Sequence, residues 1–174
     1  LKVHLTRDTD KYLQLGFRPR IAKHREADVF VSIHLNSAES SLARGVETYR
    51  LTASGFPSVQ AASEAVFNSS RYQGNGYNGA NTLLGFHIQK SLLSSTGSPD
   101  RGLRHARYAV LKGAPCPAVL VECGFLCNPE EERLLRNPNH LRKIAAGIAD
   151  GILQYRSAIG RARLLANPIS LGEQ

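Results

Sequence analysis

The feature that most constrains the fold is an apolar run at residues 28–36 (DVFVSIHLN) that contains a histidine near its end. Val, Phe and Ile favour β-strands, and a run that is apolar on both faces predicts a strand buried inside a parallel sheet. His34 would then lie at the carboxyl end of the strand, where open α/β sheets bind their ligands. A neutral imidazole there can bind a metal or transfer a proton, and a core histidine bonded to backbone is the alternative.

A second apolar run, at residues 117–125 (PAVLVECGF), contains one carboxylate, Glu122. Burial raises the pKa of such a carboxylate, which is how a general acid or base near neutral pH is made. A glutamate satisfied by a buried arginine or by backbone amides is the alternative. If the two strands lie close together in one sheet, His34 and Glu122 share a pocket. A metal-bound water held by His34 and deprotonated by Glu122 would then form a hydrolytic centre.

Helical patterns alternate with strand patterns along the chain. We expect helices at 15–26, 58–70, 81–95 and in two segments that begin at Asn128 and Asn137, further strands at 1–6, 45–51 and 108–111, and a turn at 98–102. An asparagine cap followed by proline is typical of a helix start. The sequence therefore predicts one α/β domain at 1–156, with a mostly parallel or mixed central sheet and helices on both faces, followed by a loose basic tail at 157–174.

The composition limits the possible partners. Lys and Arg number 22 against 14 Asp and Glu, which gives a formal charge of +8. Such a charge suits an anionic polymer or envelope, or a nucleic acid. The basic residues are scattered, without an aromatic platform or a known motif, so we expect no nucleic-acid partner. No run of about 18 apolar residues occurs, so we expect no membrane insertion.

Three cysteines, Cys116, Cys123 and Cys127, lie in one short region. Their odd number argues against a complete disulfide framework, and their spacing is not a standard zinc pattern. We expect buried free thiols, with a Cys123–Cys127 bridge as the alternative. A cysteine hydrolase that pairs Cys123 with His34 is one further hypothesis for the function.

Several short blocks along the chain form a specific combination, although each block alone is weak. The blocks are residues 5–10 (LTRDTD), the helix with Arg18, Ile21 and Ala22, 32–36 (SIHLN), 45–49 (GVETY), 101–103 (RGL), 110–111 (VL) and 117–129 (PAVLVECGFLCNP). Together they resemble the zinc-dependent N-acetylmuramoyl-L-alanine amidases of bacterial cell-wall turnover. The blocks follow one another in the order of that family, from Leu1 to about Tyr155.

The resemblance implies hydrolysis of the amide between the lactyl group of N-acetylmuramic acid and the L-alanine of the stem peptide in peptidoglycan. It implies one Zn²⁺ held by two His and one Glu, with His34 as the later zinc histidine. Zinc would polarise the carbonyl and lower the pKa of its water, and Glu122 would take that proton and return it to the leaving amine. It also implies a location in the periplasm or outside the cell, and allows for an activator protein whose identity is unknown.

One departure from the family pattern concerns the zinc site. In the family, the first zinc His and the zinc Glu both precede the Thr-Arg-x-x-Asp block, which here is residues 6–10. The chain starts at this block, so we expect both ligands, and a core strand and helix, to be absent from it. None of the other five histidines is assigned to the metal. The chain is then either a fragment of an active amidase or a lineage that lost catalysis and still binds the wall as a module without zinc.

Two weaker candidates concern substrate binding. Asn36 follows the first apolar strand and either lines the cleft or caps a turn. Arg101 could grip a carboxylate of the stem peptide, because a guanidinium binds carboxylates bidentately. An ordinary surface ion pair is the alternative for Arg101.

Overall fold

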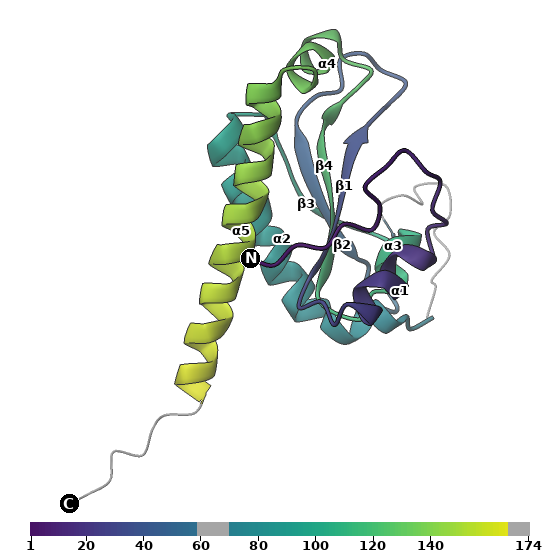
Figure 1. The fold of residues 1–174 in the computed structure, drawn as a ribbon, viewed down its shortest axis with the longest axis vertical. Coiled ribbons are helices and arrows are strands. Elements are labelled where there is room, and N and C mark those ends of the chain that lie inside the picture. Colours follow the sequence, from purple (N-terminus) through teal and green to yellow (C-terminus); the bar gives the residue numbers. More distant parts are fainter. Residues whose placement is uncertain (59–69, 167–174) are drawn as a thin grey trace, which may run out of the picture.

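The computed structural model describes residues 1–58 and 70–166. Within these residues the chain forms a four-stranded sheet of order β1-β4-β2-β3 (Figure 1). Its strands are β1 (Phe30–Asn36), β2 (Val46–Leu51), β3 (Asp100–Ala106) and β4 (Ala118–Phe125). β1 runs parallel to β4 and β2 parallel to β3, whereas β2 and β4 are antiparallel. The mixed sheet confirms the predicted fold class.

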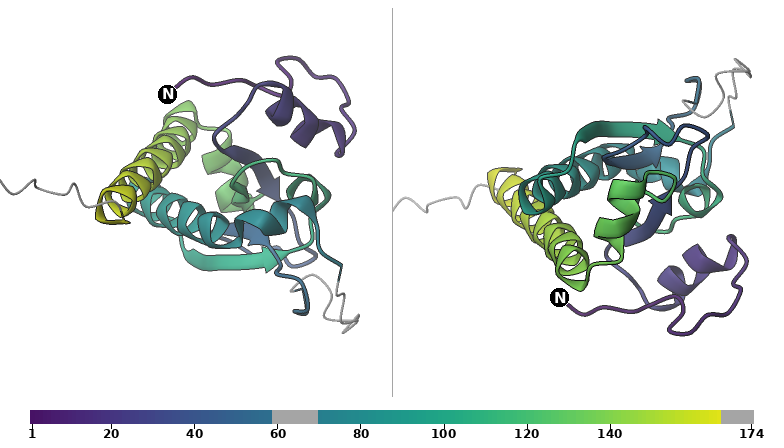
Figure 2. Two further views of the ribbon diagram at one scale, coloured as in Figure 1. Left: turned by 90° about the horizontal axis from the view of Figure 1, so that it is seen from below. Right: turned by 90° about the horizontal axis from the view of Figure 1, so that it is seen from above.

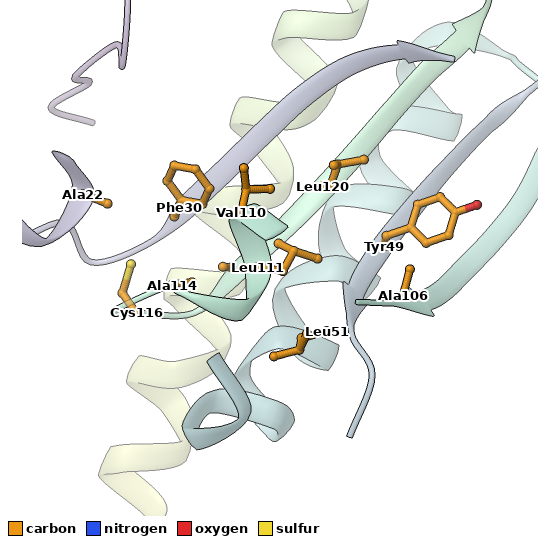
Figure 3. Close-up of a cluster of buried hydrophobic side chains, with 11 residues drawn as sticks. Ala22, Phe30, Tyr49, Leu51, Ala106, Val110, Leu111, Ala114, Cys116 and Leu120 are labelled. Carbon is orange, nitrogen blue, oxygen red and sulfur yellow. The ribbon is translucent and has the colours of Figure 1, made fainter. Parts of the chain in front are cut away.

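Helices cover both faces of the sheet, as predicted (Figure 2). They are α1 (Phe17–His24), the 3-10 helix η1 (Gln73–Tyr77), α2 (Asn78–Thr96), α3 (Ala109–Lys112), α4 (Pro129–Leu135) and α5 (Pro138–Ala166). α1 and α3 contribute to an apolar cluster with Phe30, Tyr49 and Leu120 (Figure 3). α2 and α5 lie side by side on the opposite face, over a cluster that includes Val119 and Val121. None of the helices described is long and apolar enough to cross a membrane.

The two apolar runs differ in how far they are buried. β4 is buried at all of its positions, because it has a strand on each side and helices on both faces. β1 lies at the edge of the sheet, where Phe30 and Ser32 are buried but Ile33 is 58% exposed and Leu35 43% exposed. The prediction of a strand at 28–36 is confirmed, whereas the prediction that it is buried on both faces holds only for its first half.

Both predicted asparagine caps are present. The Asn128 side chain accepts hydrogen bonds from the backbone N–H groups of Glu130 and Glu131, and Pro129 is the first residue of α4. Asn137 accepts a hydrogen bond from the N–H of Asn139 at the start of α5. These caps satisfy N–H groups that have no partner inside the helix. The Asn128 cap fixes where α4 begins after β4, and the Asn137 cap fixes where α5 begins.

Three local predictions near the strands are wrong. Residues 1–6 form no strand, and Leu1, Val3 and Leu5 are all more than 60% exposed. An extended segment needs a neighbouring strand for its backbone hydrogen bonds, and no described strand pairs with this one. Residues 108–111 lead into the short helix α3 rather than a strand, because four residues cannot distinguish the two periods. The turn expected at 98–102 is where β3 begins.

Two helix boundaries also differ from the prediction. α2 begins at Asn78 instead of Asn81. The side chain of Asn81 is buried, where it donates a hydrogen bond to the Gly74 carbonyl and accepts one from the Ala118 N–H. Asn81 therefore ties the helix to β4 instead of capping it. α5 continues to Ala166, so the predicted boundary at residue 156 falls inside a helix and no loose tail begins there. The helix expected at 58–70 falls almost entirely on residues 59–69, outside the described residues.

Candidate active site

His34 and Glu122 lie side by side on neighbouring strands. Their Cα atoms are partners in the parallel register of β1 and β4, near the carboxyl ends of both strands. Alternation along the strands places them on the face that carries Phe30 and Leu120, the face of the cluster in Figure 3. The structure therefore brings together the two residues on which the sequence hypothesis rested.

Glu122 is a buried carboxylate with one oxygen left unbonded. The residue is 6% exposed, and within the described part of the chain its buried Oε2 atom has no hydrogen-bond partner. Burial, and then the charge of Glu47 on the neighbouring strand, raise the pKa of Glu122 to about 7. A carboxyl group with this pKa can take up and release a proton near neutral pH.

Glu47 is the residue of this site that the sequence analysis missed. It is the antiparallel partner of Glu122 on β2, and its side chain is only 2% exposed. Its Oε2 accepts from Arg101 Nε and Arg104 Nη1, both at 3.0 Å. Its Oε1 accepts from Asn36 Nδ2 and from the Tyr49 hydroxyl, both at 2.9 Å. The feature of the sequence that could have identified Glu47 is a charged residue inside the predicted strand at 45–51.

Asn36 and Arg101 are both connected to the site by hydrogen bonds to Glu47. Besides its bond to Glu47, Asn36 accepts a hydrogen bond from the Ser37 N–H, so it closes a turn as well. Arg101 forms an ion pair, as the alternative prediction held, but its partner Glu47 is buried instead of lying at the surface. The Arg101 guanidinium also lies 4.8 Å from the centre of the Phe125 ring. All four predicted site residues therefore converge at one end of the sheet, and their roles remain predictions.

The environment of His34 favours the neutral imidazole. Burial, and then the charge of Arg18, lower the pKa of His34, while Nε2 lies 3.1 Å from Ser32 Oγ. A neutral imidazole is the form that binds a metal. A catalytic zinc site, however, uses three protein ligands. Among the residues that the structure describes, no group of three or more His, Cys, Asp and Glu side chains is placed to hold a metal ion.

The cysteines do not support a thiol nucleophile. All three are free thiols, two of them buried, and the alternative bridge between Cys123 and Cys127 is not formed. Burial, and then the Glu122 charge, raise the pKa of Cys123 to about 12, so its thiolate is scarce at neutral pH. Cys123 belongs to the apolar cluster on the opposite face from His34. The hypothesis of a cysteine hydrolase is therefore disfavoured.

A hollow of about 650 Å³ lies at the same end of the sheet. The segment that follows β1 and the start of α4 line it, and Asn128 Nδ2 donates to the Ser41 carbonyl across the two. In Figure 1, β1 and β4 both point toward α4 at this end. The hollow therefore lies beside the segments that follow β1 and β4, and its lining includes neither His34 nor Glu122.

Comparisons with known proteins show which family the chain resembles. A sequence model of the family described as N-acetylmuramoyl-L-alanine amidase matches residues 1–154. The amidase AmiA of Escherichia coli is 31% identical over 176 residues, which cover 89% of this chain and 61% of AmiA. The chain thus spans less than two thirds of the length of that curated relative.

Two solved structures share the fold. The catalytic domain of CwlV, an N-acetylmuramoyl-L-alanine amidase from Bacillus (Paenibacillus) polymyxa var. colistinus, is 33% identical with a TM-score of 0.72, covering 90% of this chain and 73% of that chain. The CwlD amidase from Clostridioides difficile, solved in complex with the GerS lipoprotein, is 29% identical with a TM-score of 0.64, covering 83% of this chain and 62% of that chain.

Proposed function

The chain belongs to the N-acetylmuramoyl-L-alanine amidase family, and we propose that it hydrolyses the amide between the lactyl group of N-acetylmuramic acid and the L-alanine of the stem peptide. The observation that carries this proposal is the buried, unbonded Oε2 of Glu122 beside His34 at the carboxyl ends of two parallel strands. The chain spans less than two thirds of the length of the curated relative AmiA, and we propose this activity and the peptidoglycan substrate for the whole protein.

In the proposed reaction Glu122 moves one proton. Its carboxylate accepts a proton from the attacking water, whose oxygen forms a bond to the amide carbon. Glu122 then donates that proton to the alanine nitrogen as the carbon–nitrogen bond breaks. The products are the lactyl carboxylate and a peptide with a free amino terminus. A pKa of about 7 suits both steps, because neither protonation state is costly near neutral pH.

The zinc that the family resemblance implies is not supported by the residues described. His34 is suitable as one ligand, but the described side chains do not form the set of three that catalytic zinc uses. Zinc dependence, with His34 as a ligand, remains part of the proposal. Metal analysis of the protein from the full reading frame checks it, and one zinc per chain that is lost in His34→Ala is the expected result.

A peptidoglycan-binding module without activity is the second candidate function. The Glu122 environment argues against it, because a buried polar atom without a partner lowers stability. Such a group is retained where it has a chemical use, and a module that only binds the wall has none for it. We therefore infer hydrolysis rather than binding alone.

The family also suggests where the protein acts. We propose the cell envelope, in the periplasm or outside the cell, because peptidoglycan is located there. The net charge of +8 suits an anionic envelope. CwlD is bound by a lipoprotein in its solved complex, and we propose that this chain too can be bound by a protein partner, for which no described residue suggests an identity.

Product analysis tests the proposed reaction. Purified peptidoglycan is incubated with the protein from the full reading frame, and the soluble products are identified by mass spectrometry. The expected products are stem peptides with a free L-alanine amino group, together with glycan strands that carry free lactyl carboxylates. Cleavage of another bond, or no release by the folded protein, would contradict the proposal.

A further inference from the structure

Two arginines on β3 face the same side of the sheet although they are three residues apart. Side chains alternate along a strand, so Arg101 and Arg104 would point to opposite faces of a regular one. The register of β2 and β3 shows the irregularity: Val46 pairs with Asp100 and Thr48 with Leu103, so three steps on β3 match two on β2. This is a β-bulge, and Gly102, with φ of +86°, supplies the backbone conformation that it needs.

The bulge brings both guanidinium groups to one oxygen of Glu47. Arg101 Nε and Arg104 Nη1 each donate to Oε2 at 3.0 Å. Glu47 is buried and is fixed from its other oxygen by Asn36 and Tyr49. Two positive charges and one negative charge leave an excess of one positive charge at this point, one strand away from Glu122.

Each guanidinium is also held by an aromatic ring. Arg101 lies 4.8 Å from the centre of the Phe125 ring and Arg104 5.8 Å from that of Tyr49. Both arginine side chains remain 34% exposed. Within the described residues, Glu47 is the one carboxylate with which either arginine forms an ion pair. Most of their N–H donors are therefore left for a ligand, and little side-chain freedom remains to be lost on binding.

We propose that Arg101 and Arg104, clamped together on the buried Glu47, form a binding site for a carboxylate of the stem peptide. This inference rests on the proposed function, and it adds Arg104 and Glu47 to the earlier hypothesis about Arg101. The chemistry of the substrate supports it. The lactyl carboxyl group is consumed in the amide that is cleaved, so the free carboxylates of a muramoyl peptide lie on its peptide part. A rigid guanidinium pair recognises such a group by charge-assisted, bidentate hydrogen bonds.

A binding experiment tests the site without requiring hydrolysis. The probe is a synthetic muramoyl peptide with free stem-peptide carboxylates, compared with the same peptide in which every carboxylate is a carboxamide. Calorimetric titration of the whole chain measures both dissociation constants. We expect the wild type to bind the free acid at least tenfold more tightly, which is the size of effect that a charge-assisted hydrogen bond produces.

Two variants locate the effect. Arg104→Gln is expected to bring the two dissociation constants within about twofold of each other, because the remaining Arg101 is neutralised by Glu47 and the site loses its excess positive charge. Arg50→Gln is the matched control, since Arg50 lies on the adjacent strand between residues of the Glu47 face and points away from it, and it should keep the full preference. Thermal unfolding of each variant verifies that it is folded, and the wild-type comparison needs no variant.

The outcomes separate this inference from the proposed function. Equal affinity of the wild type for both peptides, no measurable binding of the free acid at millimolar concentration, or a preference that survives in Arg104→Gln would each overturn the carboxylate site. Hydrolysis of the same peptides by the protein from the full reading frame is measured in a separate assay. Preference for the free acid without hydrolysis would uphold the site and contradict the amidase proposal.

Discussion

The two halves of the candidate site differ in how completely the described chain builds them. Around β4, Glu122 lies in a strand that is buried at every position, and its neighbour Glu47 is bonded through both oxygens. Around β1, His34 lies in an edge strand, and no group of three metal-binding side chains accompanies it in the described part of the chain. The half proposed to transfer protons is thus buried and hydrogen-bonded, whereas the half expected to hold a metal contains one of the three expected ligand side chains within the described residues.

A similar contrast, in burial, appears between two residues that lie directly opposite each other in the sheet. Ile33 and Val121 are register partners on β1 and β4, yet Ile33 is 58% exposed and Val121 is fully buried. Natural proteins usually cover or charge an apolar edge strand, because its unpaired backbone can bind other chains. A sequence run can therefore form a strand without being buried, because burial depends on the position of the strand in the sheet.

The largest effect on stability is expected from Glu47→Ala. The change leaves Asn36, Tyr49 and two arginines without their acceptor, so we expect a loss of about 3 kcal/mol of unfolding free energy in urea titration. The value is at the low end for a broken buried pair because both arginines can rehydrate. The control is Glu132→Ala, which removes an exposed pair with Arg136 and should cost less than about 1 kcal/mol. Equal losses would show that Glu47 is no structural centre.

Two alanine variants, at Val121 and at its register partner Ile33, test this contrast in burial directly. Val121→Ala removes buried methyl groups and should cost about 2 to 3 kcal/mol by the same urea titration. Ile33→Ala, on the register partner, should change stability by less than about 0.5 kcal/mol, because the side chain is largely in water. A loss at Ile33 as large as that at Val121 would mean that the β1 edge is covered in solution.

The pH dependence of stability should reveal the cost of keeping Glu122 buried. Its pKa of about 7 lies above the ordinary value of 4.5, so between these pH values the unfolded chain releases a proton that the native chain keeps. This group therefore lowers the stability of the fold progressively from pH 4.5 to pH 7, and the full loss persists above pH 7. We expect Glu122→Gln to raise stability by about 3 kcal/mol at pH 8 and to leave it unchanged at pH 4. An equal change at both values would contradict this account.

A smaller effect than those at Glu47, Val121 and Glu122 is expected at the bulge. Gly102→Ala places a side chain at a φ of +86°, and since nothing lies within 4 Å of the new Cβ, the cost is conformational and about 1 kcal/mol. Gly160→Ala, on an exposed helical position, should instead stabilise by about 0.5 to 1 kcal/mol. Thermal unfolding of the two variants measures both. A stabilising Gly102→Ala would show that the bulge is not needed to hold the two arginines together.

Local patterns predicted the elements that carry the site. The runs at 28–36 and 117–125 were recognised as strands, and their parallel pairing placed His34 beside Glu122 as expected. The caps at Asn128 and Asn137 were also predictable, because capping involves only neighbouring residues. Mixed rather than parallel pairing remained open, since strand order depends on contacts between distant segments.

The cluster around Glu47 could not be predicted from local pattern. It needs β2 to lie beside β4, an antiparallel register that pairs Glu47 with Glu122, and a bulge that turns Arg101 and Arg104 to one face. Each of these is a property of the assembled sheet. The segment 1–6 shows the opposite error, because its residues favour a strand, but no neighbouring strand in the described chain pairs with it.

The most direct test of the central claim is the rate of muropeptide release by the wild type and by Glu122→Gln, both made from the full reading frame and both verified as folded. We predict release by the wild type and a rate at least about 100-fold lower in the variant, because the amide of glutamine cannot accept and return the proton. Equal rates in the two proteins, or no release by the folded wild type, would contradict it.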